Sequence, residues 1–161
     1  MNPFKIMSIE AIETEILKEK RILQNFPKTV DFPFPDRYKS LVTSIKTSEI
    51  ASEAILYSSV EAVNENKSLQ MPDYWCFAGN GQGDRWFFDP DGNVLFYDHD
   101  DEKLQPMNIN FGQWLQMAFI IQQLDEYSDE YDDIPETVKQ HFYETLHILD
   151  PALSENYPFT V

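Results

Sequence analysis

The sequence predicts an α+β fold: a mostly antiparallel β-sheet, built as a meander, with N-terminal and C-terminal helices packed against it. Short aromatic and β-branched runs in the middle of the chain are separated by turn residues. Before and after these runs, apolar residues recur at helical spacing. The chain has 161 residues, of which 42% are hydrophobic, so we expect a single domain over residues 1–161 with its own core.

Two helices are predicted before the sheet. The first runs from about Ser8 to Phe26 and is ended by Pro27. Its apolar stripe consists of Ile9, Ile12, Ile16, Ile22, Leu23 and Phe26, and its later turns carry Lys18, Lys20 and Arg21. The second helix has Pro35 at its first position. Its apolar face consists of Tyr38, Leu41, Val42 and Ile45.

The sheet is predicted from residue 55 onward. Residues 55–63 are β-like, and residues 64–72 form a loop. Three strands then follow in "YWCFA", "RWFF" and "VLFYD", with a further short strand around Lys103 to Met107. The turns between the three strands contain Gly79, Gly81 and Gly83 in the first gap and Asp91, Gly92 and Asn93 in the second.

Two more helices are predicted after the sheet. Asn110 caps a deeply buried helix over residues 111–124. An acidic loop, "DEYSDEYDD", follows over residues 125–133. The last helix begins near Pro135 and is ended by Pro151. We expect the tail after it to dock through its aromatic side chains.

The glycine-rich stretch "GNGQGD" does not match a nucleotide-binding loop. A Walker loop ends in Gly-Lys-Ser/Thr, and a dinucleotide fingerprint is G-x-G-x-x-G at the start of a helix. Here the spacing is G-x-G-x-G, a strand follows, and Asp84 would repel phosphate. The stretch therefore predicts a hairpin turn, which Asp84 fixes through hydrogen bonds to nearby backbone.

No catalytic or metal-binding motif emerges from the remaining polar residues. "DPDGNVLFYDHDDE" fails the EF-hand pattern, because glycine comes at the fourth position and aromatic residues occupy ligand places. His141 and His147 are six residues apart, which does not align two ligands on one helix face. His99 lies between two aspartates, which favours its protonated form. Cys76 is expected to be a buried small hydrophobe. We expect no enzymatic activity, no cofactor and no metal.

The charge is strongly acidic and unevenly distributed, with a net charge of −16. Residues 1–83 carry 9 Lys and Arg against 11 Asp and Glu, whereas residues 84–161 carry 3 against 17. Such a field repels nucleic acid and anionic membranes and attracts basic proteins and cations. The single cysteine and the absence of an apolar leader or membrane span predict a cytoplasmic protein.

Four short motifs, in this order along the chain, resemble those of the SUKH superfamily, which includes yeast cell-wall assembly regulators and bacterial immunity proteins. "FPFPDRYKSLV" and "YWCFAGNGQGDRWFFD" are similar to its opening element and its glycine-turned hairpin; "GNVLFYDHDDE" and "INFGQWLQ" are similar to the acidic strand end and the following helix. The matching positions are Pro35, Tyr38, Leu41, Phe77, Ala78, Gly81, Gly83, Asp84, His99, Asp100, Phe111, Trp114 and Leu115. The resemblance covers residues 8–125. "TSEIASEA" replaces the glycine-rich turn often found after the second helix, and residues 126–161 lie outside the recognised part.

The resemblance implies a SUKH-like α+β domain and a non-enzymatic immunity or antitoxin-type function, in which the protein binds and blocks a toxin domain, frequently a nuclease. Because a nuclease presents a basic cleft, the acidic segments are the expected contact surface. The predicted contact residues are Asp98, His99, Asp100, Asp101 and Glu102 after the hairpin, and Tyr127, Asp129, Glu130, Tyr131, Asp132 and Asp133 in the acidic loop.

Two alternatives stay open. The first is a general interaction or regulatory module of the same fold without a toxin partner. The second is a small metal-dependent hydrolase, since Asp98, Asp100, Asp101 and Glu102 can bind divalent cations weakly. The hydrolase hypothesis predicts a metal-dependent activity that is lost when His99 and Asp100 are replaced together.

Overall fold

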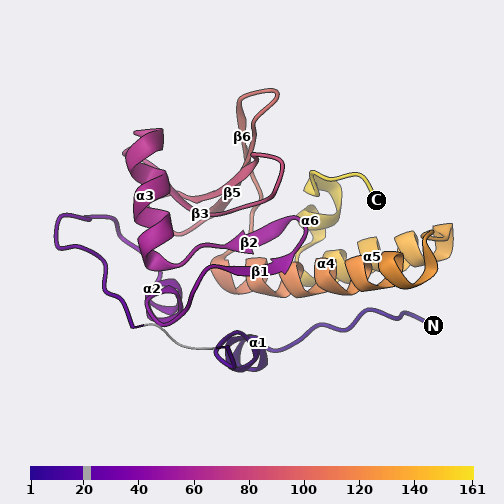
Figure 1. Ribbon diagram of the computed structural model, residues 1–161. Coiled ribbons are helices and arrows are strands. Elements are labelled where there is room, and N and C mark those ends of the chain that lie inside the picture. Colours follow the sequence, from indigo (N-terminus) through magenta and orange to yellow (C-terminus); the bar gives the residue numbers. More distant parts are fainter. Residues whose placement is uncertain (20–22) are drawn as a thin grey trace.

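The computed structural model describes residues 1–19 and 23–161 and shows an α+β fold, as predicted (Figure 1). Its elements are α1 (Ile9–Ile16), α2 (Asp36–Val42), β1 (Ser48–Ala51), β2 (Ala54–Leu56), α3 (Ser59–Leu69), β3 (Trp75–Gly79), β4 (Arg85–Phe88), β5 (Val94–Asp98), β6 (Lys103–Pro106), α4 (Phe111–Tyr131), α5 (Glu136–Leu149) and α6 (Pro151–Asn156). The six strands form one sheet in the order β1-β2-β3-β4-β5-β6, and every neighbouring pair is antiparallel.

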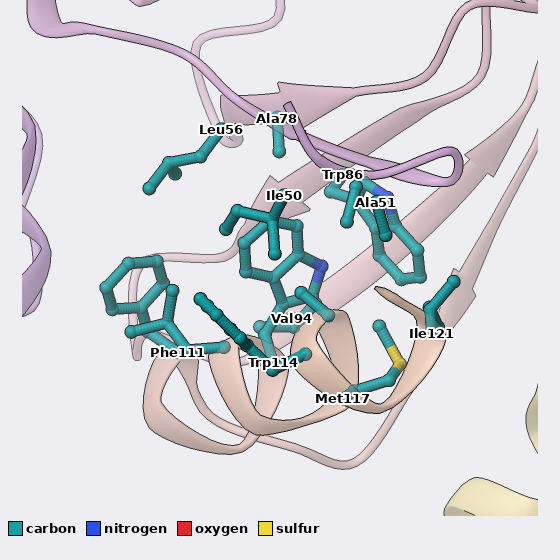
Figure 2. Packing of buried hydrophobic residues seen from close by; sticks show 14 of the residues in the cluster. Ile50, Ala51, Leu56, Ala78, Trp86, Val94, Phe111, Trp114, Met117 and Ile121 are labelled. Atoms are coloured by element: carbon teal, nitrogen blue, oxygen red, sulfur yellow. The ribbon is translucent and has the colours of Figure 1, made fainter. Parts of the chain in front are cut away.

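The main core lies between one face of the sheet and α4. Figure 2 shows Trp86 of β4 beside Trp114 and Met117 of α4, with Ile50 and Ala51 of β1 close by. All but the two β1 residues are completely buried. The rings of Trp86 and Trp114 are 6.0 Å apart. Burial of such large aromatic side chains supplies most of the driving force for this packing.

The first helix is shorter than the sequence predicts. α1 ends at Ile16, and residues 23–26 are not helical; the predicted residues Lys20, Arg21 and Ile22 lie outside the described part of the chain. The Phe26 ring stacks on Phe34 at 4.7 Å and meets Trp75 edge-on at 5.9 Å. Packing of Phe26 in this aromatic group therefore overrides the local helical pattern, which carried no information about a distant partner.

The prediction of a strand over residues 55–63 was wrong beyond Leu56, and the loop over residues 64–72 was largely wrong. The chain becomes α3 at Ser59, because the Ser58 hydroxyl accepts a hydrogen bond from the backbone N–H of Glu61 at 3.2 Å. The helix continues to Leu69 and ends at Gln70, which has a left-handed backbone. β1 was not predicted at all and lies within "TSEIASEA".

The acidic loop predicted at residues 125–133 is helical up to Tyr131, so α4 is two turns longer than expected. Neither proline nor glycine interrupts these residues, and the rings of Tyr127 and Tyr131 pack one turn apart at 4.6 Å. The predicted capping role of Asn110 is confirmed by a complete capping box with Gln113.

The C-terminal tail docks through its aromatic side chains, as predicted. Phe159 meets Trp86 at 6.0 Å and Phe96 at 5.0 Å, and Tyr157 meets Phe142 at 5.2 Å. Pro151 follows the end of α5, but it also begins the short helix α6, which Asp150 caps. Among the helices described, none combines the length and the apolar character that a membrane span needs.

Candidate partner-binding surface

The meander topology gathers three turns at one end of the sheet. Because each strand pairs antiparallel with the next, the β1–β2, β3–β4 and β5–β6 turns all lie at the same end. We name residues 52–53, 80–84 and 98–102 the turn end. Its carboxylates belong to Glu53, Asp84, Asp98, Asp100, Asp101 and Glu102. Carboxylates from three separate parts of the sequence thus share one end of the molecule.

Asn80 organises the β3–β4 turn. Its side-chain oxygen accepts hydrogen bonds from the backbone N–H groups of Gln82 at 3.0 Å and Asp84 at 3.1 Å. Gly83 has a φ of +96°, a conformation that glycine adopts without a steric penalty. The predicted hairpin is present, but the backbone bonds that fix its turn go to Asn80. The Asp84 carboxylate instead receives the Asn80 amide at 3.1 Å and reaches across to the next hairpin.

Asp84 joins the two hairpins through His99. One oxygen of its carboxylate accepts the backbone N–H of His99 at 3.1 Å and lies 2.5 Å from Nδ1 of the imidazole. This hydrogen bond is the main cause that raises the pKa of His99 above 6.5, and Asp100, 3.2 Å from Nε2, adds to it. Burial raises the pKa of Asp84, but the bonds from His99 and Asn80 outweigh burial and bring it below 3.8. His99 is therefore more readily protonated than an ordinary histidine, as predicted.

Asp98 shapes the β5–β6 turn, and the other acidic side chains of this turn are exposed. Oδ1 of Asp98 accepts the backbone N–H groups of Asp100 at 2.9 Å and Asp101 at 3.3 Å. The side chains of Asp100, Asp101 and Glu102 are exposed. His99 is exposed as well, so four of the five predicted contact residues in this segment are available to a partner, while Asp98 also shapes the turn.

Glu53 and Asp125 belong to this surface but were missed by sequence reasoning. Glu53 accepts the Asn80 amide at 3.3 Å; burial raises its pKa, and the charges of Asp84 and Asp125 raise it further. Asp125 of α4 accepts the backbone N–H of Ser52 at 2.8 Å and its hydroxyl at 2.9 Å. The sequence signal was a polar Ser-Glu pair between two short strands, which is visible only once β1 is recognised.

The other predicted acidic segment lies elsewhere. We name Tyr127, Asp129, Glu130, Tyr131, Asp132 and Asp133 the helix end, because they form the last turns of α4 and the start of its link to α5. Figure 1 shows this α4–α5 connection well separated from the β5–β6 turn. Tyr131 is 57% exposed, whereas Tyr127 packs against the core. Asp125 and Asp129 line one hollow of about 380 Å³. The charge of Asp125 also raises the pKa of Glu53, so Asp125 and Glu53 connect the two acidic surfaces.

The residues expected to have structural roles mostly lie in or beside the core. Tyr38, Phe111 and Trp114 are buried, and the Tyr38 hydroxyl accepts a hydrogen bond from Nε1 of Trp75 at 2.9 Å. Pro35 occupies the position just before α2, one residue earlier than predicted. Gly81 faces open space, so its place in the turn does not require glycine for steric reasons.

Three residues of the turn end offer ligand atoms that could hold a metal ion. Asp84, Asp98 and His99 each contribute one such atom, and these atoms lie within 4.8 Å of one another. A metal would require the deprotonated imidazole. The raised pKa of His99 and its hydrogen bond to Asp84 oppose this arrangement.

Comparison with known families agrees with the fold. The model of the SMI1 / KNR4 family (SUKH-1) matches residues 18–117, which is more than half of the chain, and the protein belongs to this family. The resemblance seen in the four motifs is thereby confirmed. The match includes the β3–β4 and β5–β6 turns and the first part of α4, but not the helix end. No curated protein and no solved structure matched the chain.

Proposed function

We propose that this protein is a non-enzymatic immunity-type protein that binds and neutralises a cognate toxin domain with a basic surface, and that the turn end is the charged part of its binding surface. The observation that carries the proposal is the gathering of carboxylates by the three turns, within a SUKH-1 fold. Membership of this family is consistent with such a role.

The arrangement of Glu53 supports a cationic partner. Folding places this half-buried carboxylate close to Asp84 and Asp125, and its pKa is raised because its charged form is disfavoured there. The fold gains nothing from this repulsion. A basic side chain of a partner would relieve it on binding, and long-range attraction to the acidic surface would also speed association.

A nuclease is the partner class that fits this charge best. A domain that cleaves nucleic acid carries a basic cleft for the phosphate backbone. A protein with a net charge of −16 can compete for that cleft without resembling nucleic acid. The helix end, joined to the turn end through Glu53 and Asp125, would extend the contact.

The proposal is tested by calorimetric titration of the protein with the C-terminal domain encoded immediately upstream, at low and moderate salt, together with an assay of that domain's nuclease activity. We expect tight binding that weakens as salt rises, and loss of nuclease activity at equimolar ratio. Absence of binding would overturn the proposal in favour of a general interaction module.

The hydrolase alternative makes a separate forecast. If the protein itself cleaves a substrate in the presence of divalent cations, and the combined His99→Gln and Asp100→Asn change abolishes that activity, the non-enzymatic proposal is wrong. The chemistry would then belong to the Asp84, Asp98 and His99 group.

A further inference from the structure

The sheet has a second apolar face, which an acidic binding surface does not explain. An antiparallel sheet with one face toward solvent normally carries polar residues on that face. Here the face opposite α4 carries Cys76 of β3, Phe87 of β4, Leu95 and Tyr97 of β5, and Leu104 of β6. We name it the outer face. Its residues form a cluster separate from the main core.

Strand register arranges these residues in two rows. Phe87 pairs with Leu95, which pairs with Pro106; one step nearer the turn end, Tyr97 lies between Arg85 and Leu104. Phe87 is fully buried and Leu95 is 8% exposed, whereas Tyr97 and Leu104 are only partly buried. The apolar surface therefore reaches solvent in the row next to the turn end.

Helix α3 covers only one side of the outer face. It packs against β3 and contributes Leu69 to the cluster. In Figure 1, α3 stands over the β3 side, and no other helix of residues 1–19 and 23–161 lies over the outer face of β5 and β6. Tyr97 and Leu104 thus sit where the sheet has no helical cover.

The charges around Tyr97 and Leu104 indicate that a partner docking there is basic. Asp98 directly follows Tyr97 in the sequence. Leu104, which pairs with Tyr97 on the next strand, lies two residues after Glu102. Arg85 shares the row with Tyr97, but its side chain pairs with Glu65 of α3 at 3.4 Å. The apolar row is therefore bordered mainly by the carboxylates of the turn end. Lys103, the residue before Leu104, is an exposed cation beside them, whereas Arg85 is paired with Glu65.

We propose that the outer face around Tyr97 and Leu104 is the apolar centre on which the basic partner domain docks, with the turn end as its charged rim. The inference rests on the proposed function and specifies its surface. Interfaces commonly combine an apolar and aromatic centre with a polar rim, and tyrosine is enriched among residues whose truncation costs most affinity. The rim steers association, while the centre slows dissociation.

The test compares arginine substitutions at two aliphatic residues, one on the outer face and one outside it. Leu104→Arg places a charge on the outer face, and Ile148→Arg places the same charge on α5, where Ile148 is 70% exposed. Dissociation of the complex with the upstream-encoded domain is measured by surface plasmon resonance. Leu104→Arg is expected to raise the dissociation rate about 10-fold or more, and Ile148→Arg to leave it unchanged. Circular dichroism checks whether both variants are folded.

Hydroxyl-radical footprinting of the wild-type complex needs no variant and covers the case in which Leu104→Arg does not fold. Tyr97 and Leu104 are expected to lose reactivity on binding, while Ile148 keeps it. If the wild-type protein binds but these side chains stay reactive, the outer face is not the docking centre and the proposed function stands. If the wild-type protein does not bind, the proposed function itself fails, and this inference with it.

Discussion

Gly83 is the residue in the β3–β4 turn whose backbone demands glycine. Its φ of +96° is one that other residues rarely adopt, whereas Gly81 in the same turn has open space around it. Gly83→Ala is expected to lower the free energy of unfolding by about 1–3 kcal/mol because the alanine backbone is strained. Gly81→Ala, the matched control, should change it by less than about 0.5 kcal/mol. Urea denaturation measures both; equal losses would contradict the assigned strain.

The pair formed by His99 and Asp84 makes stability depend on pH. The folded-state pKa of His99 is raised above 6.5, so its contribution is complete below that pH and is lost as pH rises through the folded pKa. The folded-state pKa of Asp84 is lowered below 3.8, so its contribution is present above 3.8 and lost as pH falls through the folded value. The pair therefore stabilises most between about pH 4 and pH 6.5.

We expect the melting temperature of the wild-type protein to fall more between about pH 5.5 and pH 8.5 than that of His99→Gln, because the variant has no imidazolium to lose. Differential scanning calorimetry across this range makes the comparison. A parallel fall in both proteins would show that His99 does not contribute through its charge.

At the residue scale, the protonation of His99 could be predicted from its aspartate neighbours, but its main partner could not. Asp100 and Asp98 do raise the pKa of His99, yet the larger cause is Asp84, fifteen residues away and in another hairpin. The same holds for Glu53, whose neighbours Asp84 and Asp125 come from a different strand end and a helix. Sequence neighbourhood reveals local charge only, while pairing of distant groups depends on the sheet register.

Among the elements, α3 has an unusual task, since its Asn66 takes the place of a neighbouring strand beside β3. The amide of Asn66 accepts the backbone N–H of Cys76 at 2.8 Å and donates to the Cys76 carbonyl at 2.8 Å. Strand β2 pairs with β3 only at Gly79 and Ala78, so these Cys76 groups lie beyond its reach. One side chain thus satisfies both polar groups of a strand residue.

Asn66→Ala is expected to cost about 1–3 kcal/mol of unfolding free energy, because it leaves the N–H and carbonyl of a buried residue without partners. Asn64→Ala is the matched control: Asn64 is exposed on the same helix, and the change should alter stability by less than about 0.5 kcal/mol. Guanidinium denaturation decides, and a neutral Asn66→Ala would contradict the bridging role.

The element scale also shows why the middle of the meander was predictable and its flanks were not. β3, β4 and β5 are continuous aromatic and β-branched runs between glycine turns, and such a pattern favours strands over helices. In contrast, "ILYSSVEAV" contains the end of a strand and the start of a helix, which meet at Ser58. The sequence alone gives only weak evidence that Ser58 caps a helix through the backbone N–H of Glu61. The acidic residues after Leu124 suggested a loop, but they continue α4 because nothing there breaks a helix.

At the scale of the whole molecule, we expect the Glu53 carboxylate to lower the stability of the fold and to strengthen binding of the basic domain. Its raised pKa means that its ionisation, which begins near 4.5 in an unfolded chain, disfavours the folded state. Glu53→Gln should therefore increase unfolding free energy at neutral pH by about 0.5 kcal/mol, the scale of solvent-screened charge interactions, with no gain below about pH 4. The same variant should bind the basic domain more weakly.

Chemical denaturation at the two pH values, followed by titration with the basic domain, checks both halves of the Glu53 prediction. A variant that is less stable at neutral pH would show that the carboxylate is well satisfied in the fold. A variant that is more stable but binds equally well would remove Glu53 from the binding surface.

The fold of the whole molecule could be anticipated, whereas the shape of its surface could not. Four motifs in order indicated the family and the α+β architecture, and the distribution of charge indicated an acidic surface. That the three turns share one end follows only after β1 is counted, because an omitted strand hides the β1–β2 turn. The outer face was equally hidden, since apolar residues on both sides of a strand are typical of a fully buried sheet.

The most direct test of the turn end as the charged part of the binding surface is the association rate with the basic domain, measured by stopped flow at low salt. One variant carries Asp98→Asn, Asp100→Asn and Asp101→Asn; its control carries Asp129→Asn, Glu130→Gln and Asp132→Asn, with the same change of net charge. We predict that the turn-end variant slows association about 10-fold or more, and that the helix-end control slows it distinctly less. Equal effects would show that only net charge matters, and a larger effect at the helix end would place the binding surface there; either result would contradict the proposed site.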